Sequence, residues 1–180
     1  PTWAKALWVK VPVVEEFGKQ SSFVLYECDG RYYIEDERTT REYRVEIPAE
    51  PAWYSRMTTS GVPMSRIGVL QGNYLGIYVA SRCPYRDLAN ACKFCTTRKN
   101  VGSAEEWKKS VDDVVEVARA ARDESGSIFT HLNTGYYFEE RGERETMHGL
   151  QQCEPFVRAL RERVGGFIGV QNVLLQRLIV

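Results

Sequence analysis

The chain has 180 residues, 43% of them apolar, and its 24 basic and 24 acidic side chains leave no net charge. This length and composition suit one ordinary domain with a real core, and they give no sign of a nucleic-acid partner or an anionic membrane surface. No apolar run approaches the about 20 residues that a membrane-spanning helix needs. Five cysteines with clustered spacing favour ligand use in a reducing compartment over disulfides, so we expect a cytoplasmic protein.

The first part of the chain, residues 1–72, is rich in predicted β-structure. Aromatic, β-branched and alternating stretches predict strands at residues 23–28, 31–35 and 41–47. Asp29-Gly30, between the first two, is a hairpin signal. We therefore expect a small antiparallel sheet that packs against the rest of the protein, with a substrate-binding module as the alternative.

Residues 73–180 change to a pattern in which strands alternate with helices. The first helix is expected to begin at Ser103, because Ser103 and Glu106 form a capping box. Strands that alternate with helices predict βαβ units, a parallel sheet and right-handed crossovers. The expected elements are strands at residues 74–80, 128–133 and 167–171 and helices at residues 103–124 and 150–164.

Three cysteines lie in the loop that follows the first of these strands. Cys92 and Cys95 are separated by two residues, so a tight turn aims both thiolates at one ion or cluster, and Cys83 returns from the other limb of the loop. A structural zinc site normally needs a fourth ligand, but Cys28 and Cys153 are isolated and both histidines lie well downstream. Three thiolates with an open position favour an iron–sulfur cluster whose last iron binds an outside molecule. A non-catalytic zinc or iron–sulfur module is the alternative.

The stretch of residues 74–100 resembles the cysteine loop of radical S-adenosylmethionine (radical SAM) enzymes. Phe94 stands just before the last cysteine, where that family usually has an aromatic residue. The first gap differs, because eight residues separate Cys83 from Cys92 where the family usually has three. The resemblance implies an α/β fold, a partial (β/α) barrel of which residues 73–180 would form the N-terminal half with about three strands.

The resemblance also implies the cofactors and the reaction. Cys83, Cys92 and Cys95 would hold a [4Fe–4S] cluster whose fourth iron binds the amino and carboxylate groups of S-adenosylmethionine. Reductive cleavage of that molecule would give a 5′-deoxyadenosyl radical that acts on a small-molecule substrate, which the sequence does not identify. The electron would come from a donor such as a flavodoxin or a ferredoxin.

Five further residues are candidates for binding the cofactor. The resemblance puts Phe94 beside the adenine ring. Thr134 and Gly135 follow the second strand, where the family often has a Gly-Gly-Glu-like motif that grips the amino group. Gln171 and Asn172 close the third strand and would contact the cofactor's carboxylate or ribose, or the substrate. Ordinary strand-end turns are the alternative for these four, and no residue is assigned a catalytic role.

A half barrel would leave an unpaired strand edge and an apolar face exposed. We therefore expect the chain to be a fragment of a longer enzyme. Closure of the edge by dimerisation of a short, self-sufficient enzyme is the alternative.

Overall fold

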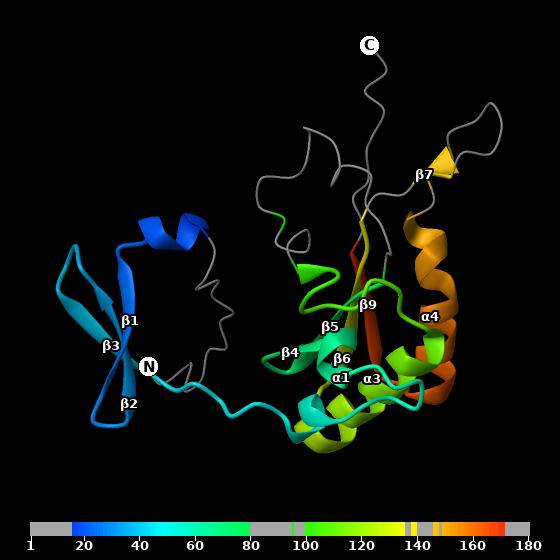
Figure 1. Cartoon of the computed structure of the whole chain (residues 1–180), viewed down its shortest axis with the longest axis horizontal. Coiled ribbons are helices and arrows are strands. Elements are labelled where there is room, and N and C mark those ends of the chain that lie inside the picture. Colours follow the sequence, from blue (N-terminus) through cyan, green and yellow to red (C-terminus); the bar gives the residue numbers. More distant parts are fainter. Residues whose placement is uncertain are drawn as a thin grey trace, which may run out of the picture. The chain divides into compact units, whose positions relative to one another are not determined.

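The computed structural model describes residues 16–79, 95, 100–135, 138–139, 146–147 and 149–171. The chain divides into two compact units, Pro1–Glu50 and Pro51–Val180, each of which is described by itself below (Figure 1). The boundary expected between residues 72 and 73 lies inside the second unit.

The first unit contains a three-stranded antiparallel sheet, and the three strands predicted for this region are confirmed. Asp29 and Gly30 have φ angles of 50° and 71°, which is the left-handed geometry of a tight hairpin turn. Tyr26 stacks on Tyr33 with ring centroids 5.6 Å apart, and its hydroxyl donates to Glu42 Oε1 at 2.6 Å. That hydrogen bond raises the pKa of Tyr26 to about 12. The elements are η1 (Glu16–Gln20), β1 (Phe23–Cys28), β2 (Arg31–Asp36) and β3 (Arg41–Val45), in sheet order β1-β2-β3.

The second unit is built on a four-stranded sheet of order β4-β5-β6-β9. Strands β5, β6 and β9 run parallel, while β4 pairs with β5 as an antiparallel edge strand. Helix α3 connects β5 to β6 and helix α4 connects β6 to β9, as in two βαβ units (Figure 1). The elements are η2 (Ala52–Ser55), α1 (Met64–Ile67), β4 (Val69–Gln71), β5 (Tyr74–Tyr78), α3 (Val111–Ser125), β6 (Phe129–Asn133), β7 (Phe138–Glu139), β8 (Thr146–Met147), α4 (Gly149–Arg163) and β9 (Phe167–Gln171).

The prediction of a partial (β/α) barrel is wrong. The described strands form a small, open, mixed sheet that does not close. The predicted βαβ units are confirmed, but a hairpin places the short strand β4 antiparallel on the outer edge of β5, with Gly72 in its turn at a φ of 66°. An antiparallel strand at that edge is incompatible with the start of an all-parallel barrel.

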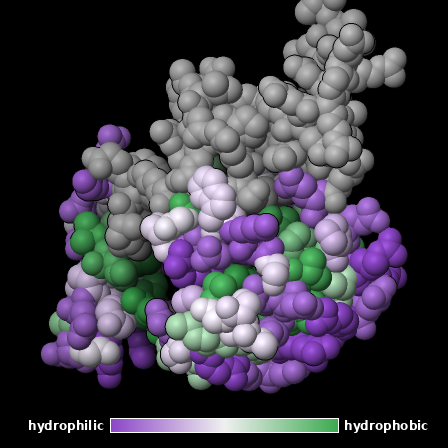
Figure 2. Space-filling model, turned by 45° about the vertical axis from the view of Figure 1, so that its right-hand side comes forward, coloured by the Kyte–Doolittle hydropathy of each residue, from purple (hydrophilic) through white to green (hydrophobic). Residues whose placement is uncertain are grey.

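The hydrophobic core lies on one face of this sheet. Leu75 and Ile77 of β5 are buried and alternate with half-buried residues, and Leu132 of β6 lies on the same face. Because side chains alternate between the faces of a strand, these buried residues all lie on one face, and helices α3 and α4 pack against that face. Figure 2 shows a surface that is mostly hydrophilic on this side of the molecule, with hydrophobic patches between. The core residues contributed by the other elements include Trp53, Ile67, Val114, Val115, Val117, Phe156 and Leu160.

Helix α3 begins at a buried carboxylate that ties it to the chain before α1. Its N-cap is Ser110, whose Oγ accepts from the Asp113 backbone N–H at 3.0 Å and donates to Asp113 Oδ2 at 2.6 Å. Ser60 donates to Asp113 Oδ1 at 2.6 Å. Burial alone would raise the pKa of Asp113, but hydrogen bonds from Ser110, Ser60 and Thr58 outweigh it and hold the pKa below its ordinary value. The expected start at Ser103 is therefore wrong, and that residue lies in a turn.

We expect Asp113→Asn to destabilise the protein by about 2 kcal/mol, because hydrogen bonds to a buried charged acceptor are lost. Since the folded carboxyl has the lower pKa, its stabilising contribution is complete at neutral pH and disappears as the pH falls below about 4. Urea unfolding of the wild type and of Asp113→Asn should therefore show a difference in the free energy of unfolding that becomes smaller in acid. Asp112→Asn is the control, because the Asp112 side chain is 75% exposed and pairs only at the surface with Arg163. If Asp113→Asn lowered the free energy of unfolding by no more than Asp112→Asn does, the prediction would be contradicted.

Candidate functional site

The carboxyl ends of β5, β6 and β9 meet at one edge of the sheet. Tyr78, Asn133 and Gln171 are partners across the parallel ladder. The ladder continues one step further, because the Val79 N–H donates to the Asn133 carbonyl at 2.9 Å and the Thr134 N–H donates to the Gln171 carbonyl at 3.1 Å. Segments that are far apart in the sequence therefore leave the sheet side by side, and the one that leaves β5 carries the three cysteines.

The structure brings two of the predicted cofactor-binding positions together at this edge. Thr134 is 2% exposed, and its hydroxyl donates to the Gly135 carbonyl at 3.1 Å. Because this hydroxyl already has a local partner, Thr134 and Gly135 offer an incoming group their backbone atoms. Gln171 is exposed, and its carbonyl accepts from the Thr134 N–H. Their role in binding a cofactor stays a prediction.

The predicted cluster ligands are described only in part. Cys95 is an exposed free cysteine, whereas Cys83, Cys92, Phe94 and Asn172 lie outside the described residues. Among the residues that the structure describes, no group of three His, Cys, Asp or Glu side chains gathers to hold a metal. The ligand set therefore stays a prediction as well.

Burial makes one of the two remaining cysteines a poor metal ligand. Cys153 is buried in α4 at 2% exposure, and burial raises the pKa of its thiol, which disfavours the thiolate that a metal needs. Cys28 is exposed at the end of β1, in the first unit.

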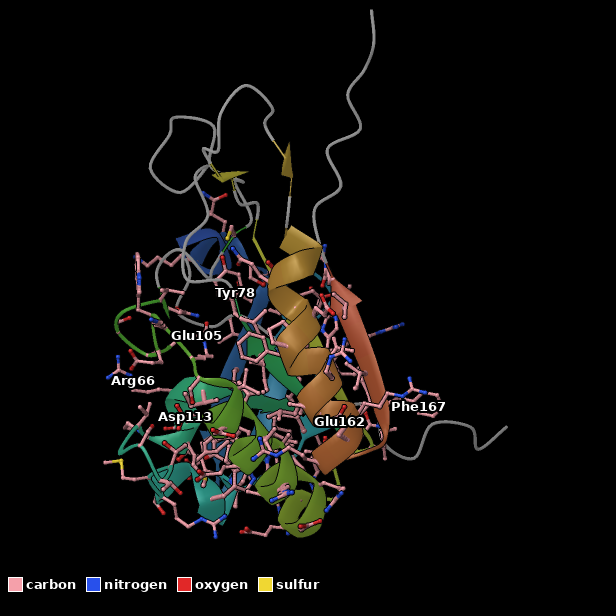
Figure 3. All side chains as sticks on the ribbon, turned by 90° about the vertical axis from the view of Figure 1, so that its right-hand side faces the viewer. Arg66, Tyr78, Glu105, Asp113, Glu162 and Phe167 are labelled. Carbon is pink, nitrogen blue, oxygen red and sulfur yellow. The ribbon has the colours of Figure 1, made fainter. Side chains whose placement is uncertain are left out.

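A buried lysine holds the end of β5 just before the cysteine segment begins. Lys109 Nζ donates to the Tyr78 carbonyl at 2.7 Å, to Glu105 Oε1 at 2.9 Å and to the Glu106 carbonyl at 3.1 Å. The Lys109 side chain is 1% exposed. Burial lowers its pKa, and the charge of Glu105 partly offsets that effect. Figure 3 shows Tyr78 and Glu105 near the same end of the sheet. The ammonium also lies 6.0 Å from the centroid of the Tyr78 ring.

The far end of the cysteine segment is anchored too. Val101 is 6% exposed and forms a bridge with Glu105. The Glu106 N–H donates to the Arg66 carbonyl at 2.8 Å, and the two side chains approach to 3.4 Å. The chain is therefore fixed on both sides of residues 80–99, to β5 on one side and to α1 on the other.

Sequence reasoning missed Lys109, because a lysine is almost never buried unless it is paired. The available signal was its place four residues after Glu105 and directly before the N-cap Ser110. Such spacing on its own is equally typical of an exposed ion pair.

Comparison of the chain with known protein families, with curated proteins and with solved structures finds no match. Within the described ranges, no helix is long and apolar enough to cross a membrane.

We expect Lys109→Met to destabilise the protein by about 2 kcal/mol, because the carbonyls of Tyr78 and Glu106 and the Glu105 carboxylate each lose the partner that the buried ammonium provides. Urea unfolding followed by circular dichroism measures the loss. Lys108→Met is the matched control, since the neighbouring lysine is exposed and its replacement should change stability by less than about 0.5 kcal/mol. Equal effects of the two substitutions would show that the buried ammonium does not hold the end of β5.

Proposed function

We propose that this chain is a radical SAM enzyme, or part of one, that reductively cleaves S-adenosylmethionine at a [4Fe–4S] cluster to form a 5′-deoxyadenosyl radical acting on a small-molecule substrate. The observation that carries the proposal is the segment with Cys83, Cys92 and Cys95, which leaves β5 at the edge where β6 and β9 also end. The proposal needs three thiolates next to these strand ends and does not need a closed barrel.

The donor set fits an iron–sulfur cluster. Thiolates are the usual ligands of such clusters, and Cys95 is exposed, whereas burial raises the pKa of the Cys153 thiol. The protein offers three cysteines in one segment rather than four, which suits a cluster that keeps one iron for a small molecule. A reducing cytoplasmic compartment suits the proposal, because thiols stay reduced there, and a flavodoxin or ferredoxin would supply the electron.

Other residues of the chain would bind and orient S-adenosylmethionine. Thr134 and Gly135 offer backbone groups at the end of β6, and Gln171 offers an exposed side-chain amide on β9, the strand that pairs with β6. Asn172, the next residue, would add a second amide, and the ring of Phe94 would stack on adenine. Lys109 acts as a positioning residue, because its hydrogen bond to the Tyr78 carbonyl fixes the point where the cysteine segment starts.

We expect that replacing any one of Cys83, Cys92 and Cys95 by Ala abolishes iron binding, because each thiolate is a required ligand. Iron and acid-labile sulfide in anaerobically purified protein measure the cluster, and release of methionine from S-adenosylmethionine measures the reaction. Cys28→Ala and Cys153→Ala are the controls and should leave both intact.

Two results would contradict this assignment. Loss of iron in Cys153→Ala with retention in Cys83→Ala would show that the ligands are misassigned. A colourless protein with about one zinc per chain would indicate a non-catalytic zinc module instead.

We expect Phe94→Ala to weaken binding of S-adenosylmethionine by about 1 kcal/mol, the scale of one aromatic contact. The iron content should stay unchanged, since no ligand is lost. Titration of the reduced cluster with S-adenosylmethionine, followed by electron paramagnetic resonance, measures the affinity. A cluster signal that saturating S-adenosylmethionine leaves unchanged in the wild-type protein would indicate an electron-transfer or structural cluster.

A further inference from the structure

The two edges of the four-stranded sheet are built differently. Strand β4 has three residues, and the outward N–H of Leu70 donates to the Tyr54 hydroxyl at 2.8 Å. Strand β9 has five residues, Phe-Ile-Gly-Val-Gln, with no charge and no proline. Natural proteins blunt exposed edges with short strands, charges, proline or a covering group. The β4 edge has two of these protections, whereas the residues of β9 supply none.

The outer side of β9 carries backbone groups that pair with no other strand of the described residues. The Gln171 carbonyl accepts from Thr134 on the β6 side, and in a parallel strand the direction of the backbone groups alternates from residue to residue. Ile168 and Val170 therefore direct their N–H and carbonyl groups outward. Within the described part of the chain, no strand lies beyond β9.

A groove of about 400 Å³ runs between α4 and this edge. Val157 and Val170 contribute its apolar surface, and Val170 is 40% exposed. Two acidic and two basic side chains surround the groove, so it carries no net charge. In Figure 3, Glu162 marks the helix and Phe167 the strand. The residues that line this α4–β9 groove are Cys153, Glu154, Val157, Arg158, Arg161, Glu162 and Val170.

We propose that a second copy of this chain occupies the α4–β9 groove, with β9 pairing antiparallel to β9 of the partner around a twofold axis. An axis perpendicular to the sheet keeps the helical faces of both copies on the same side, so the two α4 helices lie antiparallel next to each other. The outward backbone groups of Ile168 and Val170 then gain partners, and Val157 and Val170 lose their contact with water.

Charge complementarity selects a second copy over a charged partner. Glu154, Val157, Arg158 and Arg161 follow one another at spacings of three, one and three residues, which forms one stripe along the helix. Glu154 pairs with Arg158 of the same helix at 2.9 Å, and a twofold axis through the middle of this stripe places it opposite the partner's Arg161 as well, with the reverse contact repeating the pair. A strongly acidic or basic partner would face like charges in the same groove.

Sedimentation velocity on the full chain tests the proposal, with circular dichroism to confirm that each variant is folded. The wild type should sediment as a particle of twice the 20.6 kDa chain mass, and Val170→Lys should be a monomer. Val69→Lys on β4 is the matched control, because Val69 is 39% exposed and Val170 is 40% exposed. This control should remain a dimer. A monomeric wild type, or a dimer that is insensitive to Val170→Lys, would overturn the proposal.

Charge reversal decides the arrangement even if Val170→Lys fails to fold, because Glu154 and Arg161 are both exposed. Glu154→Arg or Arg161→Glu alone should weaken association by about tenfold, since like charges then face each other across the axis. The double reversal should restore wild-type affinity. Single reversals without effect, or a double variant as weak as the single ones, would overturn the proposal.

Discussion

The in-register parallel pairing of β5, β6 and β9 is the constraint on which the candidate site depends. Tyr78, Asn133 and Gln171 are partners across the ladder, so the three strands end at the same level. Helices α3 and α4 maintain this arrangement, because each returns the chain to the end of the sheet where the next parallel strand begins. The end of β5, after which the cysteines follow in the sequence, and Thr134 after β6 therefore lie at the same end of the sheet, although they are far apart in the sequence.

The buried ammonium of Lys109 adds a local constraint at a cost. Removal of a charge from water is unfavourable unless the charge is paired and hydrogen-bonded, and Lys109 meets that condition with two carbonyls and one carboxylate. These hydrogen bonds fix the position of the end of β5, and the buried side chain of Val101 fixes the chain after the cysteines. A segment that brings several ligands to one centre benefits from anchored ends, because less chain entropy is lost when the ligands converge.

Local patterns predicted most of the strands and helix α4, because burial on one face imposes a period on the sequence. Local patterns failed where two segments carry the same helix-start signal and a tertiary contact decides which of them is used. Ser103 and Ser110 are each followed three residues later by an acid, and the hydrogen bond from Ser60 to Asp113 selects the second. Strand β4 is too short to show a period, so the open mixed sheet was not foreseen. At the site, the proximity of Thr134 and Gln171 could be predicted from the order of the strands. The hydrogen bond of Lys109 to the Tyr78 carbonyl could not, because it depends on tertiary packing that the sequence pattern does not encode.

The proposed dimerisation through β9 is compatible with the candidate site at the carboxyl ends of the strands. Antiparallel pairing of β9 with its copy joins two four-stranded sheets and turns the strands of the second copy by half a revolution. The carboxyl ends of the two parallel sets then point in opposite directions along the joined sheet. In the proposed dimer, each candidate site would therefore stay at its own end of the joined sheet, and burial of the α4–β9 groove would leave Thr134 uncovered. Association through β9 would add stability to the edge while leaving two separate sites accessible to a cofactor.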